Sequence, residues 1–126
     1  MDNKDVKKIN PLKDKSFRFA LNVIKLYKLL TDEKREYIMS KQLLRSGTSI
    51  GANIREGQNA QSKADFIHKF SIAQKECDET LYWLELLHQS QYIEEQEFTS
   101  IYSNATELLK MLRSAILTTK QNIHHS

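Results

Sequence analysis

The scarcity of proline and glycine constrains the fold of this chain more than any other feature of its sequence. Pro11 is the only proline, and Gly47, Gly51 and Gly57 are the only glycines among 126 residues. Tight turns between strands usually contain these two residue types, so a sheet in this chain would lack the residues that form its turns. The sequence therefore predicts an all-α fold.

Start and stop signals divide the chain into four predicted helices. Pro11 stands just before the first helical stretch, a position where proline is tolerated. Ser62 and Asp65 have the spacing of a capping box at the start of the third helix. The glutamates within residues 94–97 suit the positive N-terminal end of a fourth. We expect helices at about residues 13–30, 33–60, 63–89 and 94–120.

The predicted helices are long and closely connected, which favours a bundle. Apolar residues recur at helical spacing along the third and fourth stretches, so each of these helices buries one face. Short connections force sequential neighbours to run antiparallel. The prediction is one domain, an up-down-up-down antiparallel four-helix bundle over residues 13–120, with a basic N-terminal tail at 1–12 and a frayed C-terminus at 121–126.

The composition excludes several classes of protein. With 40% apolar and 28% charged residues it is that of an ordinary globular protein. No apolar run approaches the roughly 18 residues that span a bilayer, and the polar start of the chain lacks the layout of a signal peptide. Cys77 is the single cysteine and has no partner for an internal disulfide. We therefore expect a cytoplasmic protein with no membrane partner.

Positive charge gathers at two places in the sequence. From Met1 to Lys28 there are eight basic residues against three acidic ones, an excess of five, so the remaining chain is slightly acidic. On the second predicted helix, Lys41, Arg45 and Arg55 lie within a narrow arc. These three cations are the candidate nucleic-acid contacts, although a solvated helix face is the commoner explanation of such a row and no aromatic residue interleaves with it.

Two glycines inside the second helix need a structural reason, because each costs about 1 kcal/mol relative to alanine. Gly47 and Gly51 are four residues apart and share a face with Leu43 and Ile54. The missing side chains would let another helix backbone approach closely. We expect close helix packing there, with a ligand role as the alternative. The stretch is not a phosphate loop, because Ala52 follows Gly51 in place of lysine.

The first and third helices carry more apolar surface than one core face requires. The first helix has one apolar face around Phe17 and another around Phe19, and the third has a second set around Trp83. Large exposed apolar patches usually mark contact surfaces. We therefore predict a homo-oligomer. The alternative is that these wide apolar faces are buried more deeply within the single bundle. The candidate interface residues are Phe19, Val23, Ile72, Tyr82, Trp83 and Leu86.

No set of residues in the sequence predicts catalysis. Glu85 and His88 have the Glu-x-x-His spacing of di-metal bundles, but no second copy exists, so we expect no metal site. Cys77 falls in the core stripe of the third helix, where a thiol is inert. No convergent Ser, His and Asp set occurs. We predict no catalytic residues, no cofactor and no enzymatic activity.

The second and third helices resemble a known bacterial family. The likeness rests on residues 42–46, on 49–57, on Phe66 with Phe70 and Ala73, and on 76–87. These stretches are similar to the four-helix bundle proteins encoded in intervening sequences of large-subunit ribosomal RNA genes. The resemblance implies a ring-shaped homo-oligomer, a pentamer. A more distant likeness to the accessory variability proteins of retroelements implies association with nucleic acid.

Two functions follow from these patterns. One is a non-enzymatic oligomeric bundle that binds RNA or DNA through a basic surface without base specificity. The other is a structural or protein–protein interaction module with no nucleic-acid role.

Overall fold

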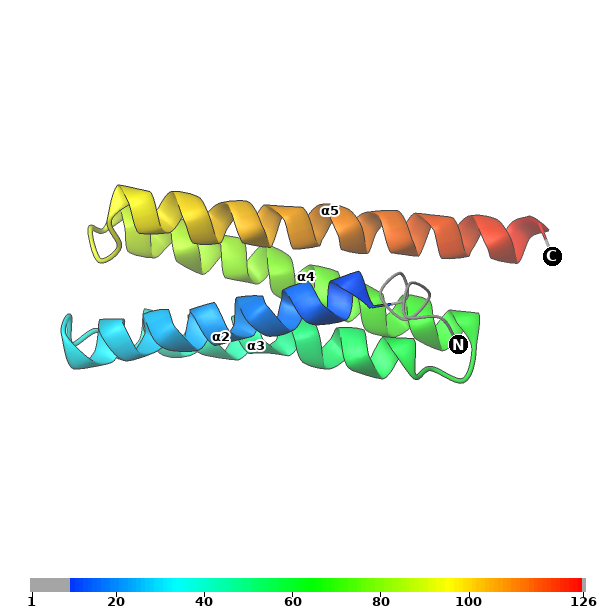
Figure 1. The fold of residues 1–126 in the computed structure, drawn as a ribbon, viewed down its shortest axis with the longest axis horizontal. Coiled ribbons are helices and arrows are strands. Elements are labelled where there is room, and N and C mark those ends of the chain that lie inside the picture. The colour runs from blue at the N-terminus through cyan, green and yellow to red at the C-terminus, as the bar shows by residue number, and fades with distance from the viewer. Residues whose placement is uncertain (1–9, 126) are drawn as a thin grey trace.

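The computed structural model describes residues 10–125 of the chain, with side chains up to Asn122, and this part contains no strand. Its helices are α2 (Pro11–Asp32), α3 (Met39–Gln58), α4 (Lys63–Gln89) and α5 (Glu95–His125). Successive helices run antiparallel, and α2 begins at the end of the bundle where α5 ends (Figure 1). The predicted all-α four-helix bundle is confirmed.

The core lies along the axis of the bundle and is almost entirely apolar. On α4 the predicted stripe is buried at Phe70, Ala73, Cys77, Leu84 and Leu87. The buried residues of α5 occur at the same helical spacing, from Ile101 to Ile116. A hydrogen-bonded pair of polar side chains is buried within it. The hydroxyls of Ser46 and Thr80, both fully buried, are hydrogen-bonded at 3.0 Å and join α3 to α4.

The glycines of α3 lie where neighbouring helices come closest. A Cβ atom at residue 47 would lie 2.8 Å from a methyl group of Val23 on α2, and one at residue 51 would lie 3.2 Å from the Ser16 hydroxyl. A Cβ atom at residue 57 would lie 2.6 Å from the ring of Phe70 on α4. Real Cβ contacts below 3.0 Å essentially never occur. The absent side chains therefore let α2 and α4 pack directly on α3.

The start of α3 differs from the prediction. The second helix begins at Met39, whereas the sequence favoured about residue 33, and residues 33–38 form a connection in which Arg35 adopts a φ of 54°. The carboxylate of Glu36 accepts hydrogen bonds from the backbone N–H groups of Met39 at 3.1 Å and Ser40 at 2.7 Å. It thereby satisfies donors that a helix start leaves unpaired. Thr31 and Asp32 are residue types that often cap a helix start, but they form the end of α2, and the chain caps α3 with a glutamate that reaches forward.

The third helix begins where the sequence predicts, at Lys63. The Ser62 hydroxyl accepts a hydrogen bond from the Asp65 backbone N–H at 3.0 Å, which confirms the predicted N-cap. The fourth helix continues to His125, five residues beyond the expected end.

Glu36 makes the stability of the fold sensitive to acid. Burial raises the pKa of its carboxyl, but the backbone hydrogen bonds from residues 38–40 outweigh burial and leave the pKa below the ordinary value of 4.5. A lowered folded-state pKa stabilises the protein above the unfolded-state pKa, and this stability is lost as the pH falls through the folded value.

We predict that Glu36→Ala lowers the free energy of unfolding at pH 7 by about 1–2 kcal/mol. It should also weaken the loss of stability below pH 4.5. Urea denaturation at pH 7 and at several lower pH values measures both effects. Glu33→Ala, at an exposed position of the same connection, is the control. Equal losses for the two variants would contradict the capping role.

The Gly47 contact gives a second prediction. Gly47→Ala should destabilise the protein by about 1–3 kcal/mol, because the buried Val23 methyl groups have no room to move. This would occur although alanine is the better helix former. Gly51→Ala, with its wider 3.2 Å contact, should be close to neutral. In a double-mutant cycle, Val23→Ala should reduce the cost of Gly47→Ala. Independent effects of the two substitutions would refute the contact as the cause.

Candidate interaction surfaces

The cationic row predicted on α3 does not form one surface. Lys41, Arg45 and Arg55 are all exposed, but the two arginines turn toward different neighbouring helices. The Arg45 guanidinium pairs with the carboxylates of Glu76, at 3.1 Å, and Glu79 on α4. Partial burial lowers the pKa of Arg45, but the two carboxylates outweigh it and raise the pKa above its ordinary value. Much of the positive charge of Arg45 is therefore offset within the chain.

Arg55 turns the other way, toward α2. Its guanidinium carbon lies 5.3 Å from the centroid of the Phe17 ring, a cation–π geometry. Both residues border a groove of about 240 Å³ between α2 and α3, whose floor includes Ala20 and Ile24. The groove is therefore an apolar surface with cations at its edge. We call Phe17, Leu21 and Ile24 with the adjoining Ala52 and Arg55 the groove face.

Two of the predicted interface residues are wrong. Phe19 and Val23 are only 2% and 0% exposed in the single chain, because they belong to its core. The face of α2 that remains outside is the one with Phe17 and Leu21, each 51% exposed. Both faces of α2 are apolar, so periodicity could not choose between them. The contact of Val23 with Gly47 accompanies the burial of the face with Phe19.

The other predicted interface residues lie on the outer side of α4. Tyr82 is exposed at 54%, Leu86 at 37%, and Ile72 and Trp83 are half-buried. The indole N–H of Trp83 donates to a Glu79 carboxylate oxygen at 3.2 Å, and the Tyr82 and Trp83 rings meet edge to face at 5.0 Å. These four residues are the tryptophan face. Tyr82 and Trp83 are thus oriented by contacts within α4, while part of each side chain remains exposed to solvent.

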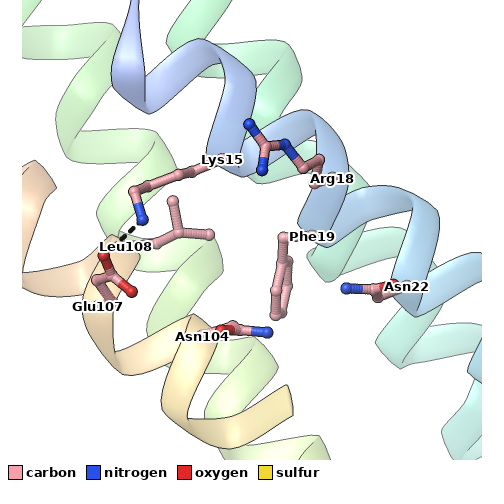
Figure 2. Close-up of a pocket in the computed structure, with 7 residues that line it drawn as sticks. All are labelled: Lys15, Arg18, Phe19, Asn22, Asn104, Glu107 and Leu108. Atoms are coloured by element: carbon pink, nitrogen blue, oxygen red, sulfur yellow. Dashed lines mark hydrogen bonds and ion pairs between the residues drawn. The ribbon is translucent and has the colours of Figure 1, made fainter. Parts of the chain in front are cut away.

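The structure also contains a polar cleft between α2 and α5 that was not predicted from the sequence. Figure 2 shows one end of it, where Arg18, Asn22 and Asn104 surround the Phe19 ring and Lys15 pairs with Glu107 at 2.6 Å. This part holds about 170 Å³, and an adjoining part of about 610 Å³ continues toward Glu94. The spacing of the polar residues 15, 18, 22 and 25 along one edge of α2 was the available signal. Because α2 supplies cations and α5 carboxylates, the cleft offers no surface of one sign.

The residues considered for chemistry have structural partners. Burial raises the pKa of the Cys77 thiol to about 12, and the thiol donates to the Ala105 carbonyl at 3.2 Å. The His88 ring stacks on the Phe98 ring with their centroids 4.0 Å apart, and its Nε2 atom lies 2.6 Å from a carboxylate oxygen of Glu95. Within residues 10–122, no group of three or more His, Cys, Asp and Glu side chains could hold a metal ion. None of the helices in this part combines the length and apolar character needed to cross a membrane.

Comparison with known proteins identifies the family. A family model described as 23S rRNA-intervening sequence protein matches residues 10–114. The chain belongs to the 23S rRNA-intervening sequence protein family. A solved structure supports this assignment, a protein of unknown function from the S23 ribosomal protein family of Bacteroides thetaiotaomicron VPI-5482. It is 56% identical over 83% of this chain and 97% of its own, with a TM-score of 0.83. A comparison with curated proteins gave no significant match.

Membership in the 23S rRNA-intervening sequence protein family agrees with the resemblance in residues 42–87. It links the chain to intervening sequences of ribosomal RNA genes, and the solved relative is itself described as having unknown function.

Proposed function

We propose that this chain is a non-enzymatic assembly protein that works as a homo-oligomer of bundles in the cytoplasm. The observation that carries the proposal is the pair of apolar faces left outside the core, the groove face on α2 and α3 and the tryptophan face on α4. Exposed apolar surface of this kind marks contact sites. The two faces lie on different helices, and we propose that each contacts the other face on a neighbouring copy.

Charge supports the same pairing of faces. The groove face has Lys13 and Arg55 at its edge. The stretch of α4 from Glu76 to Glu85, which borders the tryptophan face, carries four carboxylates and no cation. Arg45 of α3 pairs with two of them, so a net charge of −3 remains there. Opposite charges around an apolar centre favour this orientation over one that joins like faces. A contact between two different faces is heterologous and closes into a ring when the rotation permits. The family resemblance suggests a ring of five copies.

Nucleic-acid binding without base specificity is the second candidate. The family's link to ribosomal RNA genes favours it, as do the exposed cations Lys41 and Arg55. The pairing of Arg45 with two carboxylates speaks against the α3 row as its main site. If no nucleic acid binds, the assembly remains a structural or protein–protein interaction module.

Single substitutions on the two faces test the assembly. Leu21→Arg and Tyr82→Arg each place a charge at an exposed position, so folding should survive while one face is lost. We predict that sedimentation gives a multiple of 14.8 kDa for the wild type and the monomer mass for each variant. Leu117→Arg, at a 59% exposed position of α5 outside both faces, should keep the wild-type mass.

Mixing the two variants separates a heterologous contact from a symmetric one. Leu21→Arg keeps an intact tryptophan face and Tyr82→Arg keeps an intact groove face. The mixture should therefore form a dimer of one copy of each. A monomeric wild type, or variants that keep the wild-type mass, would overturn the proposal. Monomers that stay separate on mixing would overturn the heterologous geometry.

A further inference from the structure

Charge is unevenly distributed along the axis of the bundle. Contacts between Val23 and Gly47, and between Cys77 and Ala105, show which residues lie at the same level near the middle. The half that holds the start of α2 and the end of α5 comprises residues 10–21, 49–76 and 106–125. This terminal half has ten basic residues against five acidic ones, whereas the opposite half has six against nine. The two halves therefore carry net charges of +5 and −3.

Part of this excess lies where the end of α5 meets the start of α4. After Glu107, α5 contains three cations and no carboxylate up to His125. Spacings of three and seven residues put these cations on one helix face. The antiparallel register set by Cys77 with Ala105 and by His88 with Glu95 brings the start of α4 opposite the last of them. The resulting cationic strip consists of Lys63, Lys110, Arg113 and Lys120.

The cationic strip is not neutralised by carboxylates of the described residues. All four of its side chains are exposed, and none forms an ion pair within residues 10–122. By contrast, Lys15 pairs with Glu107 and Arg45 with two glutamates. Exposed Lys25, Lys28 and Lys34 also lack an ion pair within residues 10–122, but they lie in the half with a net charge of −3, next to Asp32 and Glu33 in the sequence.

We propose that the cationic strip binds the phosphodiester backbone of RNA or DNA. Lys110 and Lys120 are ten residues apart on one helix, which is about 15 Å at 1.5 Å per residue. A row of that length can follow several successive phosphates of one strand. Contacts to phosphate alone give affinity without reading the base sequence.

A protein partner fits this surface less well. Stable protein interfaces bury about 800 Å² per partner around an apolar centre that is depleted of charge. Among the described residues of α5, Leu117 is the only large apolar side chain that is more than half exposed, and it lies next to the strip. The strip also shares no residue with the groove face or the tryptophan face. The site therefore goes beyond the proposed assembly and does not depend on it.

The test compares two variants with the same loss of charge. The strip variant is Lys110→Gln, Arg113→Gln and Lys120→Gln, and the control is Lys25→Gln, Lys28→Gln and Lys34→Gln, all at exposed positions. The probe is a fluorescent 20-nucleotide single-stranded RNA titrated between 50 and 200 mM salt. The strip variant should bind more weakly at low salt, and its slope of log K against log salt should be smaller by about 2. The control should keep a slope close to that of the wild type.

Three results would overturn the site. They are salt-independent or absent binding by the wild type, equal losses in the two variants, and a loss confined to a third variant with Lys41, Arg45 and Arg55 changed to Gln. Circular dichroism checks that each variant is folded. Sedimentation of the same samples reports on the assembly separately, so strip-dependent binding by a monomeric protein would support the site and refute the ring.

Discussion

The contact between α2 and α3 decides most of what this molecule presents to its surroundings. Val23 occupies the space that a side chain at Gly47 would fill. Because α2 is apolar on two faces, this contact selects the face with Phe19 for the core and leaves the face with Phe17 and Leu21 outside. A helix with two apolar faces can bury only one of them inside a four-helix bundle. The other is an exposed surface that a second molecule can cover.

The surface is organised so that different regions have different chemistry. The groove face and the tryptophan face are apolar and bordered by opposite charges. The cationic strip at the end of α5 has charge but almost no apolar surface. The cations on α3 do not form one continuous surface, because Arg45 pairs with carboxylates of α4 while Arg55 lies over the Phe17 ring of α2. The faces proposed for assembly and the strip proposed for polyanion binding thus lie on separate parts of the bundle. In a ring the strip would be repeated once per copy, which raises affinity for a long strand without any new contact.

The sequence predicted the fold well because the fold depends on local signals. Scarce glycine and proline, the Ser62 cap and the core stripe of α4 were enough for an all-α bundle with α4 starting at Lys63. The start of α3 was missed because Glu36 caps it through a carboxylate that reaches forward by up to four residues, a pattern that cap preferences do not include.

The candidate surfaces were harder to predict because they depend on packing between helices. Helical periodicity shows that α2 has two apolar faces, but only the approach of α3 shows which one is buried. Likewise, spacing aligns Lys41, Arg45 and Arg55 on one edge of α3, yet the carboxylates that neutralise Arg45 come from residues more than 30 positions away. Such information lies in the tertiary arrangement and not in any single helix.

The central claim is that Val23 lies inside the bundle and Leu21 on a surface that another copy covers. Thiol labelling tests it directly, since the native Cys77 is buried and should stay silent while cysteine is introduced at position 21 or 23. The account predicts that Leu21→Cys reacts quickly in dilute protein and more slowly as the concentration rises, whereas Val23→Cys resists labelling throughout. Labelling of Val23→Cys as fast as Leu21→Cys in folded protein would contradict it, and so would a Leu21→Cys rate that does not depend on protein concentration.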